Sequence, residues 1–131
     1  MNGYPRMMLD AGALIHAEKY PRGKVFIECQ EAADSGLAPL LPAVVFAQVW
    51  RDPRRQHSVA KVGRVCEMLS FTERTALRVG RLLSSSKTCD VVDAAVVVEA
   101  IDHEAMIVTS DPDDIRKLVD ASGFEIPVVT V

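Results

Sequence analysis

Four aspartates in this chain have sequence neighbours that suit carboxylate chemistry. Asp10 follows the short apolar run 7–9 and precedes two small residues, and Asp111 opens the segment "DPDD" directly after the β-rich run 105–110. Asp90 and Asp93 stand three residues apart at the front of the apolar stretch 91–101. Like charges held together at the edge of a core repel each other and raise each other's pKa unless a cation joins them. The pattern therefore indicates a metal site built from carboxylates.

The ligand types also indicate which metal would bind there. Carboxylate oxygens without histidine or cysteine favour hard cations, so Mg²⁺ or Mn²⁺ is the expected cofactor. Such ions serve phosphoryl chemistry by orienting a water, lowering its pKa and neutralising charge on the phosphate. The three cysteines are odd in number and far apart, and the histidines lack metal-binding spacing, so neither a zinc site nor a disulfide framework is predicted.

Each of these aspartates also has a structural interpretation. Asp111 before a proline resembles a helix start, and Asp90 with Asp93 resembles a capping box. Taken alone, Asp90 is better explained as a cap, whereas Asp111 fits either role. Asp93 precedes residues that should be packed, and Asp10 has no obvious capping partner further along the chain. Convergence of these side chains in the fold would favour the functional interpretation.

Helices and short apolar strands alternate from end to end, without a hairpin signal. We expect strands near 7–9, 37–42, 69–71, 105–110 and 125–131, helices over 12–20, 23–36, 42–52, 54–68, 72–83, 90–101 and 111–123, and a loop at the serine run 84–86. This alternation is typical of α/β proteins with a small parallel sheet flanked by helices on both faces. Ligands of such sheets bind outside the carboxyl ends of the strands, where Asp10 and Asp111 should both lie. We predict one domain over 7–131 behind a loose leader at 1–6, with Met7 or Met8 as the functional start.

Composition and charge limit the class of protein. The chain has 131 residues, of which 49% are hydrophobic and 25% charged, and it shows neither a membrane span nor a signal peptide, so a soluble, cytosolic protein is expected. Residues 51–64 carry five Lys or Arg against one Asp, whereas residues 90–125 carry ten Asp or Glu against two basic residues. This asymmetry suits a site that holds cations and receives a polyanion. The candidates for phosphate contacts, which could equally form a solvated helix face, are Arg51, Arg54, Arg55, Lys61 and Arg64.

Four segments together resemble the PIN-domain ribonucleases of the VapC toxin type. They are "MLDAGALI" near the start, "PAVVFAQVW" in the middle, "CDVVDAAVV" later and "IVTSDPDDI" near the end, and their order and spacing fit over almost the whole chain. The resemblance implies a PIN-like domain with Mg²⁺- or Mn²⁺-dependent endoribonuclease activity. It also implies homodimers, an RNA substrate and inhibition by a cognate VapB-type antitoxin.

The resemblance also implies roles for individual residues. The catalytic metal ligands would be Asp10, Asp93 and Asp111, with Asp90 and Asp114 in assisting positions. One position departs from the family pattern, because the usual second acid falls on Gln48, whose amide can assist but carries no charge. Either Asp90 and Asp114 supply the missing charge, which we favour, or metal binding is weak. The predicted helix 42–52 should direct Gln48 towards Asp10, because Val44 and Ala47 should face the core.

Two other interpretations stay open beside the endoribonuclease toxin. A catalytically weak PIN-like domain could act by binding RNA or a protein, and Gln48 favours this alternative. An aspartyl-phosphate domain with Asp10 as acceptor is a third, but a second aspartate two residues on and a late lysine are missing. Thr109 and Ser110 are candidates for orienting a water or phosphate. Trp50 is better explained as a core or interface aromatic than as a base-stacking residue.

Overall fold

The computed structural model describes residues 5–131, which form a parallel sheet with the strand order β3-β2-β1-β4-β5. All neighbouring strands run parallel. The strands are β1 (Met7–Leu9), β2 (Leu40–Pro42), β3 (Glu67–Leu69), β4 (Met106–Thr109) and β5 (Val128–Thr130). The predicted fold class, a small parallel α/β sheet flanked by helices, is confirmed.

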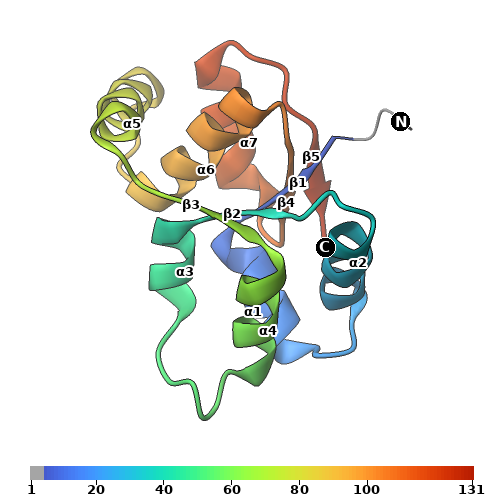
Figure 1. The fold of residues 1–131 in the computed structure, drawn as a ribbon. Coiled ribbons are helices and arrows are strands. Elements are labelled where there is room, and N and C mark those ends of the chain that lie inside the picture. The colour runs from blue at the N-terminus through green and yellow to red at the C-terminus, as the bar shows by residue number, and fades with distance from the viewer. Residues whose placement is uncertain (1–4) are drawn as a thin grey trace.

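Helices cover both faces of this sheet (Figure 1). One face carries α1 (Ala11–Lys19), α2 (Lys24–Asp34), α3 (Ala43–Val49) and α4 (His57–Val65), and the other carries α5 (Glu73–Ser86), α6 (Val91–His103) and α7 (Pro112–Ser122). Right-handed crossovers explain this division. The chain crosses from β1 to β3 in one direction and then returns past β1 to β4 and β5, so its later helices lie on the opposite face.

The core lies on both faces of the sheet, and on one of them α6 packs over the central strands. Met8, Leu9 and Ile107 are fully buried, and so is almost all of the apolar run of α6 from residue 94 to residue 98. Small alanine and valine side chains let α6 pack closely over β1, β2 and β4. The sequence prediction of a buried helix in this region is therefore confirmed. The sheet and α6 together form the rigid base of the site described below.

The region between α4 and α5 differs from the sequence prediction. A helix was expected over 54–68 and a strand over 69–71, but α4 ends at Val65 and β3 spans 67–69. The residues of β3 pair in parallel with 40–42 of β2, and Cys66 is already extended. Backbone pairing at the sheet edge therefore outweighs the helical pattern of the sequence.

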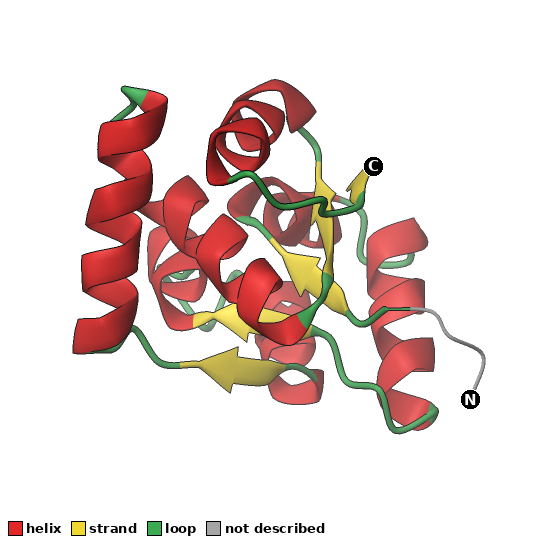
Figure 2. Ribbon diagram, turned by 90° about the horizontal axis from the view of Figure 1, so that it is seen from above, coloured by secondary structure: helices red, strands yellow, loops and turns green. Residues whose placement is uncertain are grey.

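The serine run 84–86 also differs from the prediction, because it forms the last turn of α5 rather than a loop. Ser86 is buried, and its hydroxyl contacts the Leu83 carbonyl at 3.3 Å and the Thr88 hydroxyl at 2.7 Å. The helix ends at Lys87, whose φ of 56° lies in the left-handed region. The hydroxyl bond to the preceding turn satisfies the buried Ser86, which makes a helical end possible here. Figure 2 shows the resulting long helix at one side of the molecule, leading on from β3.

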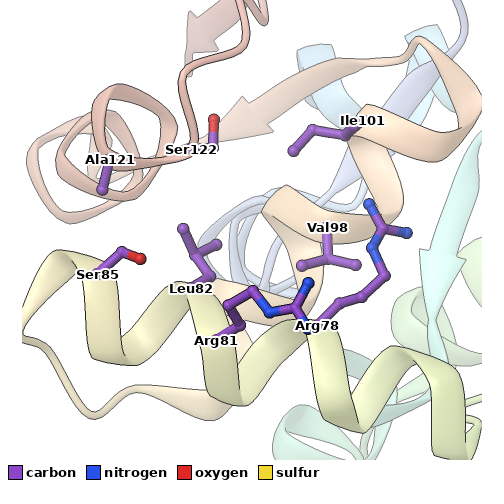
Figure 3. A pocket seen from close by; sticks show the side chains of 8 residues that line it. All are labelled: Arg78, Arg81, Leu82, Ser85, Val98, Ile101, Ala121 and Ser122. Carbon is purple, nitrogen blue, oxygen red and sulfur yellow. The ribbon is translucent and has the colours of Figure 1, made fainter.

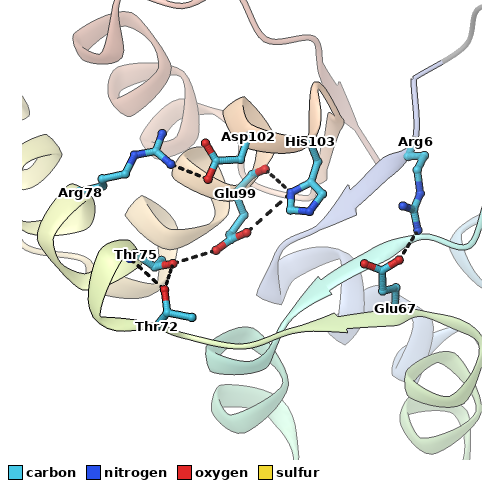
Figure 4. A network of polar contacts seen from close by, with 8 residues as sticks. All are labelled: Arg6, Glu67, Thr72, Thr75, Arg78, Glu99, Asp102 and His103. Carbon is cyan, nitrogen blue, oxygen red and sulfur yellow. Dashed lines mark hydrogen bonds and ion pairs between the residues drawn. The ribbon is translucent and has the colours of Figure 1, made fainter.

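A polar network joins α5 to α6 (Figure 4). Glu99 is only 8% exposed; Thr75 donates its hydroxyl to Glu99 Oε1 at 3.2 Å, and the His103 ring lies 3.7 Å from Oε2. Arg78 forms an ion pair with Asp102 nearby. These contacts satisfy a buried carboxylate and fix α5 in its position beside α6.

The amino-terminal end of the described chain is held in place by Arg6. Of the predicted leader at 1–6, residues 1–4 lie outside the described residues, while Arg6 donates to the Ala38 carbonyl at 2.6 Å and contacts Glu67 at 3.2 Å. Cys29, Cys66 and Cys89 are free thiols. No helix within residues 5–131 is long and apolar enough to cross a membrane.

Gln56 organises the loop between α3 and α4. Its side chain is only 6% exposed, its Oε1 accepts the backbone N–H groups of Arg51 and Asp52, and its Nε2 donates to the Val49 carbonyl at 2.9 Å and to Glu18 at 3.2 Å. The amide thus replaces backbone pairing over a segment that has no regular structure. Removing it would leave buried polar groups without partners.

We therefore expect Gln56→Ala to lower the free energy of unfolding by about 2–3 kcal/mol, because several buried hydrogen bonds are lost together. Urea denaturation followed by circular dichroism measures this change. The matched control is Gln48→Ala, since Gln48 is exposed, and its effect should stay within about 0.5 kcal/mol. Equal effects of the two substitutions would contradict the role assigned to Gln56.

Candidate metal centre

Asp10 lies at the carboxyl end of β1 and begins α1. Its side chain is 5% exposed, and its Oδ1 accepts the Ala13 N–H at 2.8 Å. The expectation that Asp10 has no capping partner is therefore wrong: it is the N-cap of α1, a role that an aspartate three residues before a helical N–H could have indicated. Burial raises the pKa of Asp10, and the charge of Asp111 adds to the rise, while hydrogen bonds from Thr109 and the backbone oppose it.

Asp90 and Asp93 stand together at the start of α6. Asp90 is the N-cap, and its Oδ1 accepts the Asp93 N–H at 3.0 Å, so the predicted cap is confirmed. Burial, followed by the charges of Asp90, Asp10 and Asp114, raises the pKa of Asp93 to about 7. Asp93 thus lies within electrostatic reach of three other carboxylates, which come from three separate helices.

Asp111 and Asp114 lie at the start of α7, beyond the carboxyl end of β4. Asp111 occupies the N-cap position, but its side chain makes no capping hydrogen bond. Its backbone N–H instead bonds to the hydroxyl of the buried Thr109 at 3.0 Å. The exposed carboxylate of Asp111 is therefore not used as a cap, which favours the functional interpretation of this residue.

A close backbone approach brings the two strand ends together. β1 and β4 are paired, with Leu9 opposite Val108, and a Cβ added at Gly12 would lie only 2.2 Å from Ser110 Oγ. The glycine thus lets the start of α1 approach the loop before α7. The chain leaves β1 and β4 in opposite directions, and ligands of open α/β sheets bind at such a switch point.

The donor set fits a hard divalent cation. A hollow of about 200 Å³ is lined by Asp90, Asp93 and Asp114, together with Thr88, Cys89 and Lys117. Within residues 5–131, however, no three histidine, cysteine or acidic side chains lie close enough together to share one metal ion. The carboxylates are therefore near enough to repel one another but are not drawn together to ligating distance. Oxygen-only donors still match the chemistry of Mg²⁺ or Mn²⁺, and the pKa values of Asp10 and Asp93 are raised, chiefly by burial.

Gln48 lies on the exposed side of α3. The buried side chains of α3 are Val45 and Val49, and the partly buried Val44 packs against the core, as predicted. Ala47 and Gln48 are exposed, so the prediction that Ala47 faces the core is wrong. The helix is only two turns long, and its packing against α1 and α6 selects the stripe at positions 45 and 49. Among the described residues, Gln48 forms no hydrogen bond with any aspartate side chain.

The predicted basic segment lies on the face that carries α1 to α4. Figure 1 shows the loop between α3 and α4 at the ends of these helices that are remote from the sheet. There Arg51 donates to the carbonyls of Ala47 and Trp50, and Arg54 lies 3.7 Å from Asp52. Lys61 and Arg64 lie on α4, and Arg55 lies in the loop. Trp50 stacks on Phe46 with a centroid distance of 5.3 Å, as expected of a packed aromatic.

The parallel sheet, its strand order and the acids at its carboxyl edge define a PIN-like α/β fold. No family model matches the sequence, and no curated protein matches it. The fold resembles a chain in the VapBC2 complex of Rickettsia felis, solved with a promoter DNA fragment (TM-score 0.71, 13% identity, 95% of this chain and 98% of that one). It also resembles a chain in DNA-bound VapBC of Salmonella typhimurium, with a TM-score of 0.71 and 14% identity over 96% of this chain and 98% of that one. A chain in FitAcB of Neisseria gonorrhoeae is similar as well, with a TM-score of 0.62 and 14% identity over 95% of this chain and 96% of that one. This likeness confirms the predicted PIN-like fold.

Proposed function

We propose that the protein is a metal-dependent endoribonuclease that uses Mg²⁺ or Mn²⁺. Asp10, Asp93 and Asp111 would hold the metal, and Asp90, Asp114 and the amide of Gln48 would assist. The observation that carries this proposal is the gathering of carboxylates around the half-buried Asp93, whose pKa is raised to about 7 first by burial and then by these neighbouring charges. A cation bound among these carboxylates would offset their repulsion and could bind a phosphate at the same site.

The chain's own residues have distinct tasks in this reaction. A divalent cation, when bound, supplies charge neutralisation at the phosphate and acidifies water. Asp10 is fixed by the Ala13 N–H, so one of its oxygens has a defined direction. Asp93, whose pKa is about 7 in the metal-free chain, would lose its proton when a cation binds, and its charge would then help to hold the metal and to orient the attacking water. Attack of that water on phosphorus would break the bond to the leaving ribose oxygen.

The activity is tested by incubating the purified protein with single-stranded RNA in Mg²⁺, Mn²⁺ or EDTA. We expect internal cleavage that depends on the metal and stops in EDTA. Products are resolved on a denaturing gel, with a 5′ label to separate internal cuts from stepwise removal of terminal nucleotides. Full-length RNA after long incubation in either metal would contradict the nuclease proposal.

We further propose that the nuclease is a cytoplasmic, homodimeric toxin that a VapB-type antitoxin neutralises. The support is the likeness to chains of VapBC and FitAcB assemblies. Induced expression should then arrest bacterial growth, and co-expression of a small protein encoded beside it should restore growth. Harmless accumulation of an RNA-cleaving protein would count against the toxin while leaving the nuclease in place.

A second candidate function is an RNA- or protein-binding domain with weak catalysis. Two observations favour it: Gln48 carries no charge, and within residues 5–131 no three acidic side chains lie close enough together to share one metal ion. It predicts RNA binding without cleavage even in saturating Mn²⁺. We prefer the nuclease because Asp90 and Asp114 lie close enough to Asp93 to supply the charge that Gln48 lacks.

A further inference from the structure

A second hollow lies where α5, α6 and α7 meet, apart from the acidic one (Figure 3). Its volume is about 170 Å³, and its apolar lining includes Leu82, Val98 and Ile101. Figure 3 shows the side chains of Arg78 and Arg81 along the same side of this hollow. It therefore combines an apolar surface with two guanidinium groups.

The two hollows follow one another along the same helices. On α7, Asp114 and Lys117 line the acidic hollow, and Ser122 lines the second. On α6, Val98 and Ile101 follow Asp93 by five and eight residues, which corresponds to about 8–12 Å along the helix. A ligand longer than one nucleotide could therefore occupy both hollows at once.

The cations along this path are available for an anionic ligand. Arg81 and Lys117 form no ion pair with any side chain of residues 5–131, and Arg81 makes no hydrogen bond there through its guanidinium. Arg78 is held by Asp102, which fixes its orientation while leaving other N–H donors free. In the basic loop between α3 and α4, by contrast, Arg51 and Arg54 already contact their own loop.

We propose that the substrate RNA lies single-stranded along the seam of α5, α6 and α7, with a nucleotide beside the scissile phosphate seated in the hollow of Arg78 and Arg81. Arg81 binds the phosphate of that nucleotide, and the base packs on the apolar lining. A guanidinium can pair with phosphate oxygens and also stack on a base, so arginine suits both contacts. This proposal rests on the nuclease function proposed above and assigns its substrate to the face opposite the predicted basic segment.

The test measures binding of a fluorescein-labelled, mixed-sequence, single-stranded 12-nucleotide RNA in EDTA, so that no cleavage is needed. Arg81→Gln should weaken binding about five-fold at 0.1 M salt and lower the slope of log affinity against log salt by about 0.7, the value for one lost phosphate contact. The matched control is Arg64→Gln, which removes one charge from α4 on the other face and should change neither quantity.

A second variant tests the hollow itself. Ala121→Phe on α7 fills part of the hollow without changing the charge, so it should weaken binding and leave the salt slope unchanged. Equal effects of Arg81→Gln and Arg64→Gln, or a larger effect of the control, would overturn the assignment to this seam.

The two proposals fail in different ways. If the parent protein cleaves RNA but Arg81→Gln and Ala121→Phe bind it as tightly as the parent, the seam is wrong and the nuclease stands. If the parent neither binds nor cleaves RNA in the presence of metal, the nuclease proposal is wrong and the seam falls with it.

Discussion

Asparagine in place of Asp10 is expected to lower RNA cleavage at least about a hundred-fold while leaving the fold intact, because it removes a metal-binding charge. Asparagine is as good an N-cap as aspartate, so the hydrogen bond from the Ala13 N–H can persist. Burial raises the pKa of Asp10, which means that its charged form is disfavoured in the folded protein. The melting temperature in EDTA should therefore stay the same or rise.

Cleavage of labelled RNA and thermal unfolding are measured on the same preparations. Asp120→Asn is the matched control, because Asp120 is an exposed aspartate on α7, and it should cleave RNA like the parent. If Asp10→Asn retains full activity, Asp10 is only a helix cap. If the variant is inactive but melts far below the parent, the loss reflects the fold and gives no support to a metal role.

The second large effect concerns pH. In EDTA, the stability of the folded protein should fall as pH rises from about 4 to about 7. The pKa of Asp93 is about 7 in the folded chain, against about 3.9 for an unfolded aspartate, so the folded state binds more protons in this range. The raised pKa of Asp10 acts in the same direction. Because Asp93 is only half-buried, solvent screening reduces the expected loss to about 1–2 kcal/mol.

Adding Mn²⁺ should reverse this loss at pH 7, because a cation bound by these carboxylates offsets their repulsion. At a hundred times its dissociation constant, a ligand of the folded state adds about 2.7 kcal/mol. Urea denaturation at pH 4.5–7.5, with Mn²⁺ or EDTA, measures both effects. Asp93→Asn should show a flatter pH profile and little response to Mn²⁺. A parental response to pH and Mn²⁺ in this variant would rule out Asp93 as the centre of the site.

The fold was accessible from the sequence because its signals are local. Apolar runs followed by aspartate or proline mark the strand ends, and the uninterrupted alanine and valine residues after Asp93 mark the buried helix. The boundary between α4 and β3 was missed because pairing with β2 is a distant interaction, and the pattern of residues 54–68 still reads as helical. The serine run was missed because hydroxyls that bond to the previous turn leave no sign in the sequence.

Part of the candidate site was also predictable from local sequence signals. The order of strands and aspartates indicated which carboxylates would share the carboxyl edge, and the charge interactions of Asp93 agree with this expectation. The direction of Gln48 was not predictable, because the packing of the short α3 depends on its neighbours. The hollow of Arg78 and Arg81 was also not predictable, since three helices must meet before it exists.

The pairing of β1 with β4 has a consequence for the timing of activity during synthesis. Asp10 and β1 are made long before the partner strand β4, which begins at Met106, and Asp111 follows later still. Ribosomes add about 5–20 residues per second, so a nascent chain exists for seconds with its first acid made and its last ones missing. A ribosome-bound chain that stops before β4 should therefore leave RNA intact. The proposed nuclease would therefore not endanger the messenger or the ribosome that is producing it until Asp111 has been made.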